Sequence, residues 1–442
     1  MPPSRRPDGV LVLGGVSLAE VARDPRLGTP SYVYDLDAIA AEARELRSGF
    51  DDGTARAPHL VAYAVKANSA GLIVTTLAAE GCGADVVSGA ELSLALRCGV
   101  RPEHVVYSGV GKTDAELDLA IGCGDAGIGA IQVESVEEIP RIAARAEALG
   151  RVARVSLRIN PAVDADALDT HSYIATGHDE AKFGVPLSSA SDAVELLAGS
   201  RSIRVVGVGS HVGSQLTATD GYLASARALF GFAREVRARF ELAFVDTGGG
   251  FGIDYGEGCP VRPVDFVRAT RRLQGEFGLG DLALYCEPGR SLVAAHGVLV
   301  ASVVQRKVAG ARRWTIIDAG MNDLMRPALY QARHRVVPVV LDPGASVHAC
   351  DVVGPVCESS DDFGVHDLPD DTTRGALREV AILDAGAYGY SMASCYNGRA
   401  LAAEVFVRGG AIIGATPRKA TSDWVDDRLA AGTSRSVTAR GA

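Results

Sequence analysis

The strongest constraint on the fold is a regular alternation of strand-like and helix-like segments over residues 36–296. Apolar runs of strand length end near eight positions, namely Lys66, Ser88, Gly109, Glu134, Asn160, His211, Thr247 and Glu287. Segments with a helical period, such as GLIVTTLAAEG and AELSLALRCG, separate nearly all of these runs. Eight such units predict an α/β chain with a closed parallel (β/α)8 barrel of the TIM type; an open, doubly wound sheet is the alternative.

The rest of the chain predicts a second domain. Over residues 297–416 the helical period disappears, and apolar runs alternate with Gly, Pro and Asp turns. This pattern indicates a mostly antiparallel β-barrel or sandwich. We expect the strand-like runs of residues 1–35, VLVLGGV and SYVYD, to join that domain, so that the barrel is inserted between its two parts. The first nine residues, MPPSRRPDG, are expected to be a loose tail, and residues 417–442 a polar tail with one short helix near SDWVDDRLA.

Composition excludes several classes of function. The formal net charge of −10 argues against a nucleic-acid or anionic-membrane partner. No stretch reaches the roughly 18 apolar residues of a membrane span, and the N-terminus lacks the apolar core of a secretory signal. The 8 cysteines include no CxxC pair, which argues against a zinc site and a disulfide scaffold. These features predict a cytoplasmic protein without a metal.

Lys66 is the first candidate for chemistry. It ends the apolar run HLVAYAV at the point where the chain turns polar, in AYAVKAN (62–68). In a barrel of this type the C-terminal ends of the strands carry the active site. A lysine amine desolvated there has a lowered pKa and is suited to Schiff-base chemistry. The alternative is an ordinary lysine at a strand end, with its ammonium in water.

Two further strand ends suit the binding of a phosphorylated aromatic cofactor. VDTGGGFG (245–252) places three consecutive glycines, Gly248, Gly249 and Gly250, after a strand, where bare N–H groups can cradle a phosphate. In HVGSQ (211–215), the His211 imidazole can stack on an aromatic ring and Ser214 can donate to a phosphate oxygen. A tight turn and a hydrogen-bonded core histidine are the alternatives. SGVGKT (108–113) lacks the first glycine of a P-loop.

EPGR (287–290) follows the last barrel strand. A buried carboxylate at Glu287 needs a partner, and a pyridinium nitrogen would serve. That pairing makes the ring an electron sink. Gly289 and Arg290 can meet anions from the same turn. The alternative is an internal Glu–Arg ion pair. Together with Lys66, His211 and the glycines, Glu287 describes a site for pyridoxal 5'-phosphate.

These motifs resemble one family in order along residues 30–407. AYAVKAN, GADVVSGAEL, HSYIATGHDEAKFG, HVGSQ, DTGGGFG, EPGR, MRPALYQARH, GPVCESSD and DAGAYGYSMASCYN are similar to the diaminopimelate decarboxylase family, in the alanine racemase-like, fold type III group. The resemblance implies a homodimer with shared active sites. It also implies decarboxylation of meso-2,6-diaminopimelate to L-lysine and CO2, the last step of lysine biosynthesis.

The resemblance also implies roles for individual residues. Lys66 is similar to the cofactor-linked lysine, and His211 is similar to the ring-stacking histidine. Cys357 is similar to the acid that the partner subunit contributes to protonate the carbanion. The implied cofactor contacts are Ser214, Gly248–Gly250, Glu287, Gly289, Arg290 and Tyr388. The implied substrate contacts are Arg290, Arg326, Tyr330, Glu358 and Tyr388. Arginines suit the carboxylates of diaminopimelate, and Glu358 suits its distal ammonium.

Two departures from the family pattern bear on the substrate. Cys395 stands where the family has Asn, and RALAAEV (399–405) replaces RPRPAEV. A related decarboxylase that acts on another amino acid or on an intermediate of secondary metabolism is therefore the alternative function. A non-catalytic homologue would be expected to lose Lys66 or Cys357, and an alanine racemase fits Cys357 with Glu358 less well.

Overall fold

A computed structural model describes residues 3–51, 58–161, 182–259, 261–342, 344–369 and 377–433. Residues 171–181 of the motif HSYIATGHDEAKFG lie outside this description. The chain divides into two compact units, a barrel unit (Ala38–Ala294) and a β unit (Met1–Asp37 with Ala295–Ala442). No helix among the described residues is long and apolar enough to cross a membrane.

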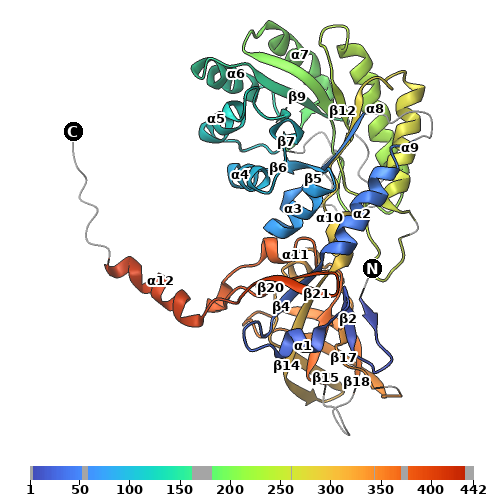
Figure 1. Ribbon diagram of the computed structural model, residues 1–442, viewed down its shortest axis with the longest axis vertical. Helices are drawn as coiled ribbons and strands as arrows, with labels where there is room; N and C mark the ends of the chain where they lie inside the picture. The colour runs from blue at the N-terminus through green and yellow to red at the C-terminus, as the bar shows by residue number, and fades with distance from the viewer. Residues whose placement is uncertain are drawn as a thin grey trace. The chain divides into compact units, whose positions relative to one another are not determined.

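The barrel unit is a closed ring of parallel strands with helices outside it (Figure 1). The ring strands are β5 (His59–Ala64), β6 (Gly83–Val86), β7 (Val105–Tyr107), β8 (Ala130–Val133), β9 (Ala153–Asn160), β11 (Ile203–Gly209), β12 (Phe244–Asp246) and β13 (Ala283–Cys286). β5 pairs with β13, and β8 pairs with β9, so the sheet has no free edge within the ring. The predicted barrel is confirmed, and the open sheet is excluded.

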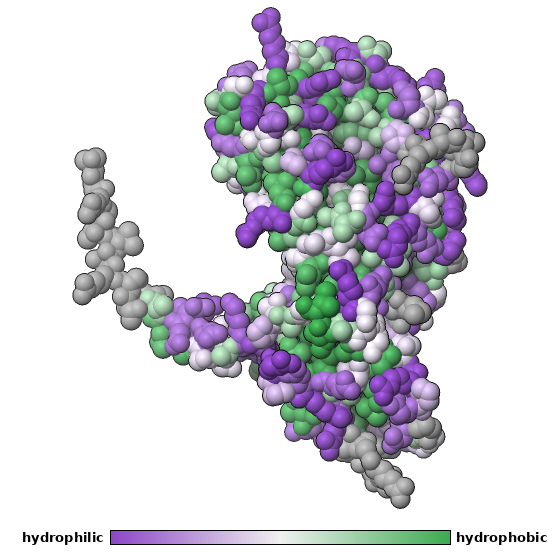
Figure 2. All heavy atoms as spheres, viewed as in Figure 1, coloured by the Kyte–Doolittle hydropathy of each residue, from purple (hydrophilic) through white to green (hydrophobic). Residues whose placement is uncertain are grey.

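Helices follow the strands in the order that the sequence period indicates. They are α3 (Gly71–Ala79), α4 (Gly89–Arg97), α5 (Asp114–Gly122), α6 (Glu138–Ala148), α7 (Ala190–Gly199), α8 (Asp220–Val236), α9 (Pro263–Glu276) and α10 (Arg290–Val293); α2 (Leu36–Ser48) precedes β5, and the short β10 (Val185–Pro186) pairs with β9. α5 begins with a capping box, because the Thr113 side chain accepts from the Glu116 N–H while Glu116 reaches back to the Thr113 backbone. Hydrophilic side chains are spread over these outer helices, with smaller hydrophobic areas between them (Figure 2).

The barrel interior is filled with side chains. The rings of Phe244 and Tyr285 stack with centroids 4.2 Å apart. A Cβ on Gly207 of β11 would lie 2.4 Å from the Phe244 ring, so only glycine fits at that position. The packed interior leaves the C-terminal ends of the strands as the place for chemistry.

The β unit is built from strands of both chain ends. Its main sheet has the order β18 (Asp362–Pro369), β17 (Val347–Val353), β15 (Arg312–Ile317), β14 (Gly297–Ala309), β4 (Ser31–Asp35), β20 (Ala403–Arg408) and β21 (Ala411–Thr416), with β16 (Val336–Pro338) and β19 (Glu379–Ile382) attached beside β14. Most pairs are antiparallel, but β4 with β20 and β15 with β17 are parallel. The predicted pairing of the N-terminal strands into this domain is confirmed for β4.

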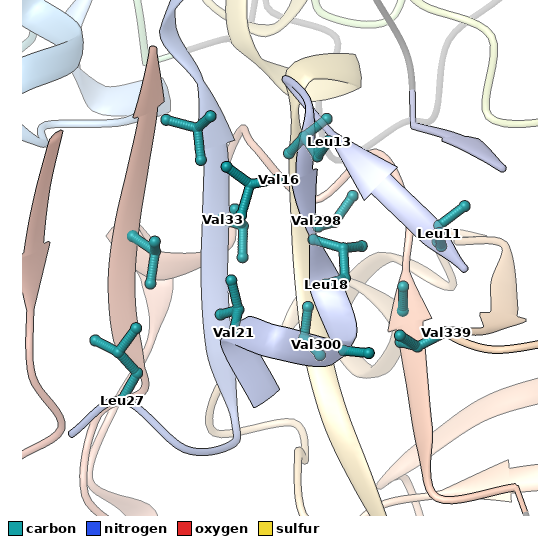
Figure 3. Close-up of a cluster of buried hydrophobic side chains, with 14 residues drawn as sticks. Leu11, Leu13, Val16, Leu18, Val21, Leu27, Val33, Val298, Val300 and Val339 are labelled. Atoms are coloured by element: carbon teal, nitrogen blue, oxygen red, sulfur yellow. The ribbon is translucent and has the colours of Figure 1, made fainter. Parts of the chain in front are cut away.

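The core of the β unit lies under a small N-terminal layer. That layer consists of β1 (Ser4–Arg5), β2 (Leu11–Leu13), β3 (Val16–Ser17) and α1 (Leu18–Arg23). Leu13, Leu18 and Val21 pack with Val33 of β4 and Val298 of β14 (Figure 3). The helix α11 (Arg326–Tyr330) and the C-terminal helix α12 (Thr421–Thr433) complete the unit. α12 confirms the short helix predicted in the tail.

One expectation about the N-terminus is wrong. Instead of a loose tail, Ser4 and Arg5 form strand β1, which pairs with β2. The Arg5 guanidinium donates to the carbonyl oxygens of Gly9 (2.5 Å) and Pro338 (2.8 Å). These two hydrogen bonds tie the charged segment to the sheet, which its polar composition did not reveal.

Candidate active site

Lys66 lies one turn beyond strand β5, in the 3-10 helix Val65–Ala67. Its Nζ donates to Asp85 Oδ2 at 2.7 Å, and Asp85 belongs to β6, the next strand of the ring. The Asp85 side chain is fully buried, whereas 37% of the Lys66 side chain is exposed. The Lys66 amine, which we expected to be desolvated, instead forms an ion pair with the buried carboxylate at the end of the neighbouring strand.

Three buried carboxyl groups gather at this end of the barrel. Glu287 follows β13, which pairs with β5, so barrel closure brings it to the Lys66 side of the ring. Burial raises the pKa of Glu287 well above its usual range, and the nearby Asp246 and Asp85 raise it further. Burial also raises the pKa of Asp246 to about 6. Like charges at close range oppose one another's ionisation, so burial and the neighbouring carboxylates both favour the protonated form of Glu287.

His211, which follows β11, is neutral. Burial lowers its pKa well below the usual range, and the positive charges of Arg158 and Lys66 lower it further. Its Nδ1 accepts a hydrogen bond from the Gly249 N–H at 3.1 Å. The single ring proton is therefore on Nε2. The 3.7 Å approach of Nδ1 to Glu287 Oε2 is not an ion pair, because the His211 imidazole is neutral.

The triple glycine after β12 forms a turn that no other residue can replace. Gly248 and Gly250 have φ of +70° and +93°. A Cβ on Gly249 would lie 2.0 Å from the Glu287 carbonyl oxygen. The amides of Gly248 and Gly249 donate to Asp246 and His211. Of the three, Gly250 alone has an N–H that donates to no group within the described residues.

Arg290 and Ser214 are joined directly. Arg290 begins α10 and is buried; its Nη2 donates to Ser214 Oγ at 2.8 Å, and its Nη1 donates to the Tyr255 hydroxyl at 2.7 Å. The alternative of an internal ion pair between Glu287 and Arg290 is not found among the described residues, since Arg290 turns to the loop after β11. A guanidinium and a hydroxyl placed together suit a phosphate or carboxylate.

A buried ion pair, Arg158 with Glu134, lies at the ends of β9 and β8, across the ring from β5. Arg158 Nη1 donates to both carboxylate oxygens of Glu134, at 2.9 and 3.1 Å. Burial would raise the pKa of Glu134, but Arg158, Lys112 and the N–H groups of Gly109 and Gly184 outweigh it and lower the pKa. Lys112, from the segment that resembles an incomplete P-loop, is buried and donates to Glu138 at 3.0 Å. Lys112 is thus a structural residue.

The remaining predicted site residues belong to the β unit. Arg326, at the start of α11, is buried, and its Nη1 donates to His334 Nε2 at 2.7 Å. His334 Nδ1 donates in turn to the Leu383 carbonyl oxygen at 2.9 Å, which fixes the imidazole tautomer. Tyr330 ends the same helix and is half-buried. Tyr388 is half-buried with a left-handed φ of +56°.

Cys357 and Glu358 are exposed on the loop between β17 and β18. The Cys357 N–H donates to Asn397 Oδ1 at 2.9 Å. The Glu358 carboxylate accepts a hydrogen bond from the Tyr396 hydroxyl. Cys395 is exposed on the same loop as Tyr396 and Asn397. The thiol and the carboxylate thus lie side by side on the surface of the β unit.

Comparison with known proteins gives this arrangement a context. Residues 36–294 match the family model described as "Pyridoxal-dependent decarboxylase, pyridoxal binding domain". The diaminopimelate decarboxylase of Zymomonas mobilis subsp. mobilis is 39% identical over 422 residues, which cover 95% of this chain and 97% of the relative.

Solved structures agree with this comparison. The diaminopimelate decarboxylase from Helicobacter pylori complexed with L-lysine has a TM-score of 0.83 at 37% identity, covering 91% of this chain and 97% of the other. That of M. jannaschii in co-complex with L-lysine has a TM-score of 0.87 at 33% identity, covering 96% and 97%.

The barrel, with its lysine, neutral histidine and buried acid, is that of a pyridoxal-dependent decarboxylase. The full-length likeness narrows this class further: the chain belongs to the diaminopimelate decarboxylase family. Pyridoxal phosphate is accordingly its cofactor.

The residues of the barrel fit pyridoxal phosphate. The buried oxygens Asp85 Oδ1 and Asp246 Oδ2 have no hydrogen-bond partner among the described residues, which marks a polar site left incomplete by the protein alone. The buried carboxyl of Glu287 suits a basic ring nitrogen, because the two groups can share a proton. The turn at Gly249 packs directly on the Glu287 backbone, since a Cβ there would lie 2.0 Å from the Glu287 carbonyl oxygen.

Sequence reasoning assigned no role to three of the site's acidic residues: Asp85, Glu134 and Asp246. Each lies at or near the end of an apolar strand run, as Lys66 and Glu287 do. That shared position was the available signal, because a charged residue at the mouth of a barrel strand is more often functional than one on an outer helix. Their partners could not be inferred, since they depend on which strands are neighbours.

Asp246 gives a prediction for the pH dependence of stability. Its pKa is raised from 3.8 to about 6, so folding takes up a proton that the unfolded chain releases. The resulting stability is fully present below about pH 4 and is lost as the pH rises through about 6. A shift of two pKa units corresponds to about 3 kcal/mol. We expect the cofactor-free Asp246→Asn variant to gain roughly 2–3 kcal/mol over wild type between pH 4 and pH 7.

Urea unfolding of both proteins across this pH range measures the difference. Asp125→Asn, in an exposed turn, is the matched control and should track wild type throughout. Parallel stability curves for Asp246→Asn and wild type would mean that Asp246 is ionised in the folded protein at low pH.

Proposed function

We propose that the chain decarboxylates meso-2,6-diaminopimelate to L-lysine and CO2, as the names of its relatives describe for those proteins. The observation that carries this proposal is the likeness to diaminopimelate decarboxylases over more than nine-tenths of the chain at about 40% identity. The joint presence of Lys66, Glu287, Cys357 and Glu358 is consistent with it.

In the proposed mechanism the barrel residues hold the cofactor. When bound, pyridoxal phosphate supplies a sink for the electron pair that remains after CO2 departs. Lys66 Nζ would hold the cofactor covalently. Neutral His211 would stack on its ring, and Glu287 would share a proton with its ring nitrogen. Ser214, Gly250 and the Gly289–Arg290 turn would bind its phosphate, with Tyr388 assisting them.

Recognition of the substrate is assigned to the cationic and polar residues. Because the product is L-lysine, the D centre loses its carboxylate and the L centre stays distant from the reaction. Arg290 and Arg326 suit the carboxylates, since a guanidinium can make two parallel hydrogen bonds to each. Tyr330 and Tyr388 add hydroxyl donors. Glu358 suits the ammonium of the L centre, because it presents an exposed carboxylate.

Cys357 is proposed to give its Sγ proton to the carbon that has lost CO2. A cysteine thiol can donate a proton near neutral pH. We also propose that two copies associate and that each active site uses Cys357 of the partner subunit. The exposure of Cys357 and Glu358 on the β unit supports this, since such residues are available to a second copy. A cytoplasmic location agrees with the eight free cysteines.

Product analysis tests the proposed function. The purified full chain with pyridoxal phosphate is incubated with meso-diaminopimelate, and L-lysine and CO2 are quantified. LL-diaminopimelate, L-ornithine and L-arginine are tested in parallel, because Cys395 and the RALAAEV run support a different substrate as the alternative. Release of lysine from the meso isomer supports the proposal. Turnover of another amino acid, with none of diaminopimelate, would establish the alternative.

A further inference from the structure

Two loops of the β unit, one of which contains Cys357, face each other in register. The first is residues 354–361, between β17 and β18, and the second is residues 393–399, before β20; we call them the paired loops. Three hydrogen bonds connect them: Arg399 Nη2 to the Pro355 carbonyl oxygen (3.2 Å), the Cys357 N–H to Asn397 Oδ1 (2.9 Å), and the Tyr396 hydroxyl to Glu358 Oε1. One loop thus runs antiparallel to the other, residue by residue.

Each of the paired loops is anchored to the rest of the β unit. Asp361 is buried, and its carboxylate accepts from the Met321 N–H (2.6 Å) and the Val356 N–H (2.6 Å). In the second loop Asn397 has a left-handed φ of +55°. A Cβ on Gly398 would lie 3.4 Å from the Trp424 ring of α12, so that ring packs against the loop. Tyr396 is therefore presented from a fixed backbone.

The hydrogen bond from the Tyr396 hydroxyl restricts the flexible side chain of Glu358. A glutamate on the surface loses rotamer entropy when a ligand fixes it, and that loss weakens binding. A charge-assisted hydrogen bond that fixes it beforehand lowers this cost to the ligand. The hydrogen bond to Glu358 also raises the pKa of Tyr396, so its hydroxyl remains a donor. One carboxylate oxygen of Glu358 accepts from Tyr396, and the other accepts no hydrogen bond from the part of the chain that the structure describes, so it can meet a cation.

We propose that Tyr396 is a positioning residue, which orients the Glu358 carboxylate toward the distal ammonium of the substrate and so favours substrates that carry that ammonium. This inference rests on the proposed function and deepens it. The competing explanation is that Tyr396 only braces the paired loops. The two explanations differ in which ligands they affect, because a brace acts on every ligand of the site.

The first test is Tyr396→Phe in the full chain loaded with pyridoxal phosphate. We expect the KM for meso-diaminopimelate to rise about fivefold to tenfold, with kcat within about twofold of wild type. The absorbance of the lysine-bound cofactor should not change. Tyr285→Phe, on barrel strand β13, is the matched control and should leave KM unchanged. In a Glu358→Gln background, Tyr396→Phe should add no further increase.

The second test separates positioning from bracing without turnover. L-lysine retains the ammonium of the L centre, whereas 6-aminohexanoate differs from it only in lacking that group. Isothermal titration calorimetry on the loaded protein should show that Tyr396→Phe weakens L-lysine about fivefold to tenfold and leaves 6-aminohexanoate unchanged. Equal weakening of both ligands, or no weakening of either, would overturn the positioning role.

The outcomes distinguish this inference from the proposed function. If the wild-type chain releases no lysine from meso-diaminopimelate, both the proposed function and the role of Tyr396 are wrong. If it does, and Tyr396→Phe matches wild type in KM and in L-lysine binding, only the role of Tyr396 fails. A Tyr396→Phe effect that persists undiminished in Glu358→Gln would also overturn it, because the hydroxyl would then act through another group.

Discussion

Lys66→Ala should abolish the absorbance of the covalently bound cofactor and reduce decarboxylation by roughly 10³-fold or more. The physical reason is that Lys66 provides the only amine at the end of β5, where Asp85 holds it at 2.7 Å. Without it the cofactor would bind only through its phosphate and ring contacts. Absorbance spectra of the purified variant, with and without added pyridoxal phosphate, measure the loss.

Chemical trapping makes the Lys66 experiment specific. Borohydride reduction of the loaded wild-type protein should leave the cofactor on the peptide that contains Lys66, as read by mass spectrometry. Lys307→Ala, on an exposed part of β14, is the matched control and should keep both absorbance and activity. A cofactor band that survives in Lys66→Ala, or a label on a different lysine, would contradict the assignment.

Cys357→Ala should bind the cofactor normally and lose activity by about 10²-fold or more. The variant removes a proton donor and leaves the backbone contact to Asn397 intact, because the N–H of residue 357 makes that hydrogen bond. Steady-state kinetics should therefore show a lower kcat with little change in the cofactor spectrum. Cys123→Ala, in the barrel unit, is the control. Near-full activity of Cys357→Ala would exclude the thiol as the donor.

Mixing two inactive variants tests whether active sites are shared. Lys66→Ala supplies an intact Cys357, and Cys357→Ala supplies an intact Lys66. If both belong to one site across two copies, random exchange of subunits restores about a quarter of the wild-type activity. If each chain forms its own site, the mixture stays inactive.

The sequence predicted the barrel and its strand ends because both depend on local patterns. Runs such as HLVAYAV are buried and bounded by polar residues, so their ends at Lys66 and Glu287 could be placed within a few residues. Strand β18 (Asp362–Pro369) was missed because DFGVHDLP mixes charges and glycine with few apolar residues. Its place at the edge of the sheet, next to β17, tolerates that composition.

Partners across the chain could not be predicted in the same way. The bond between Lys66 and Asp85 requires β5 and β6 to be neighbours, and the contact of Cys357 with Asn397 joins two loops far apart in sequence. The pKa values of Glu287 and Asp246 are raised by burial and by the charge of Asp85, which come together only in the closed ring. The residue types were enough to identify candidate site residues, but their pKa values depend on packing that the sequence does not show.

The position of β4 has a consequence for protein synthesis. This strand is made among the first 35 residues, yet it lies between β14 and β20, which the ribosome delivers only after the whole barrel. The barrel is one continuous stretch of chain and can fold as soon as it emerges. The N-terminal segment must meanwhile wait with its strand edges unpaired, which makes it a natural client for chaperones. The β unit can therefore complete its sheet only after the barrel has been synthesised.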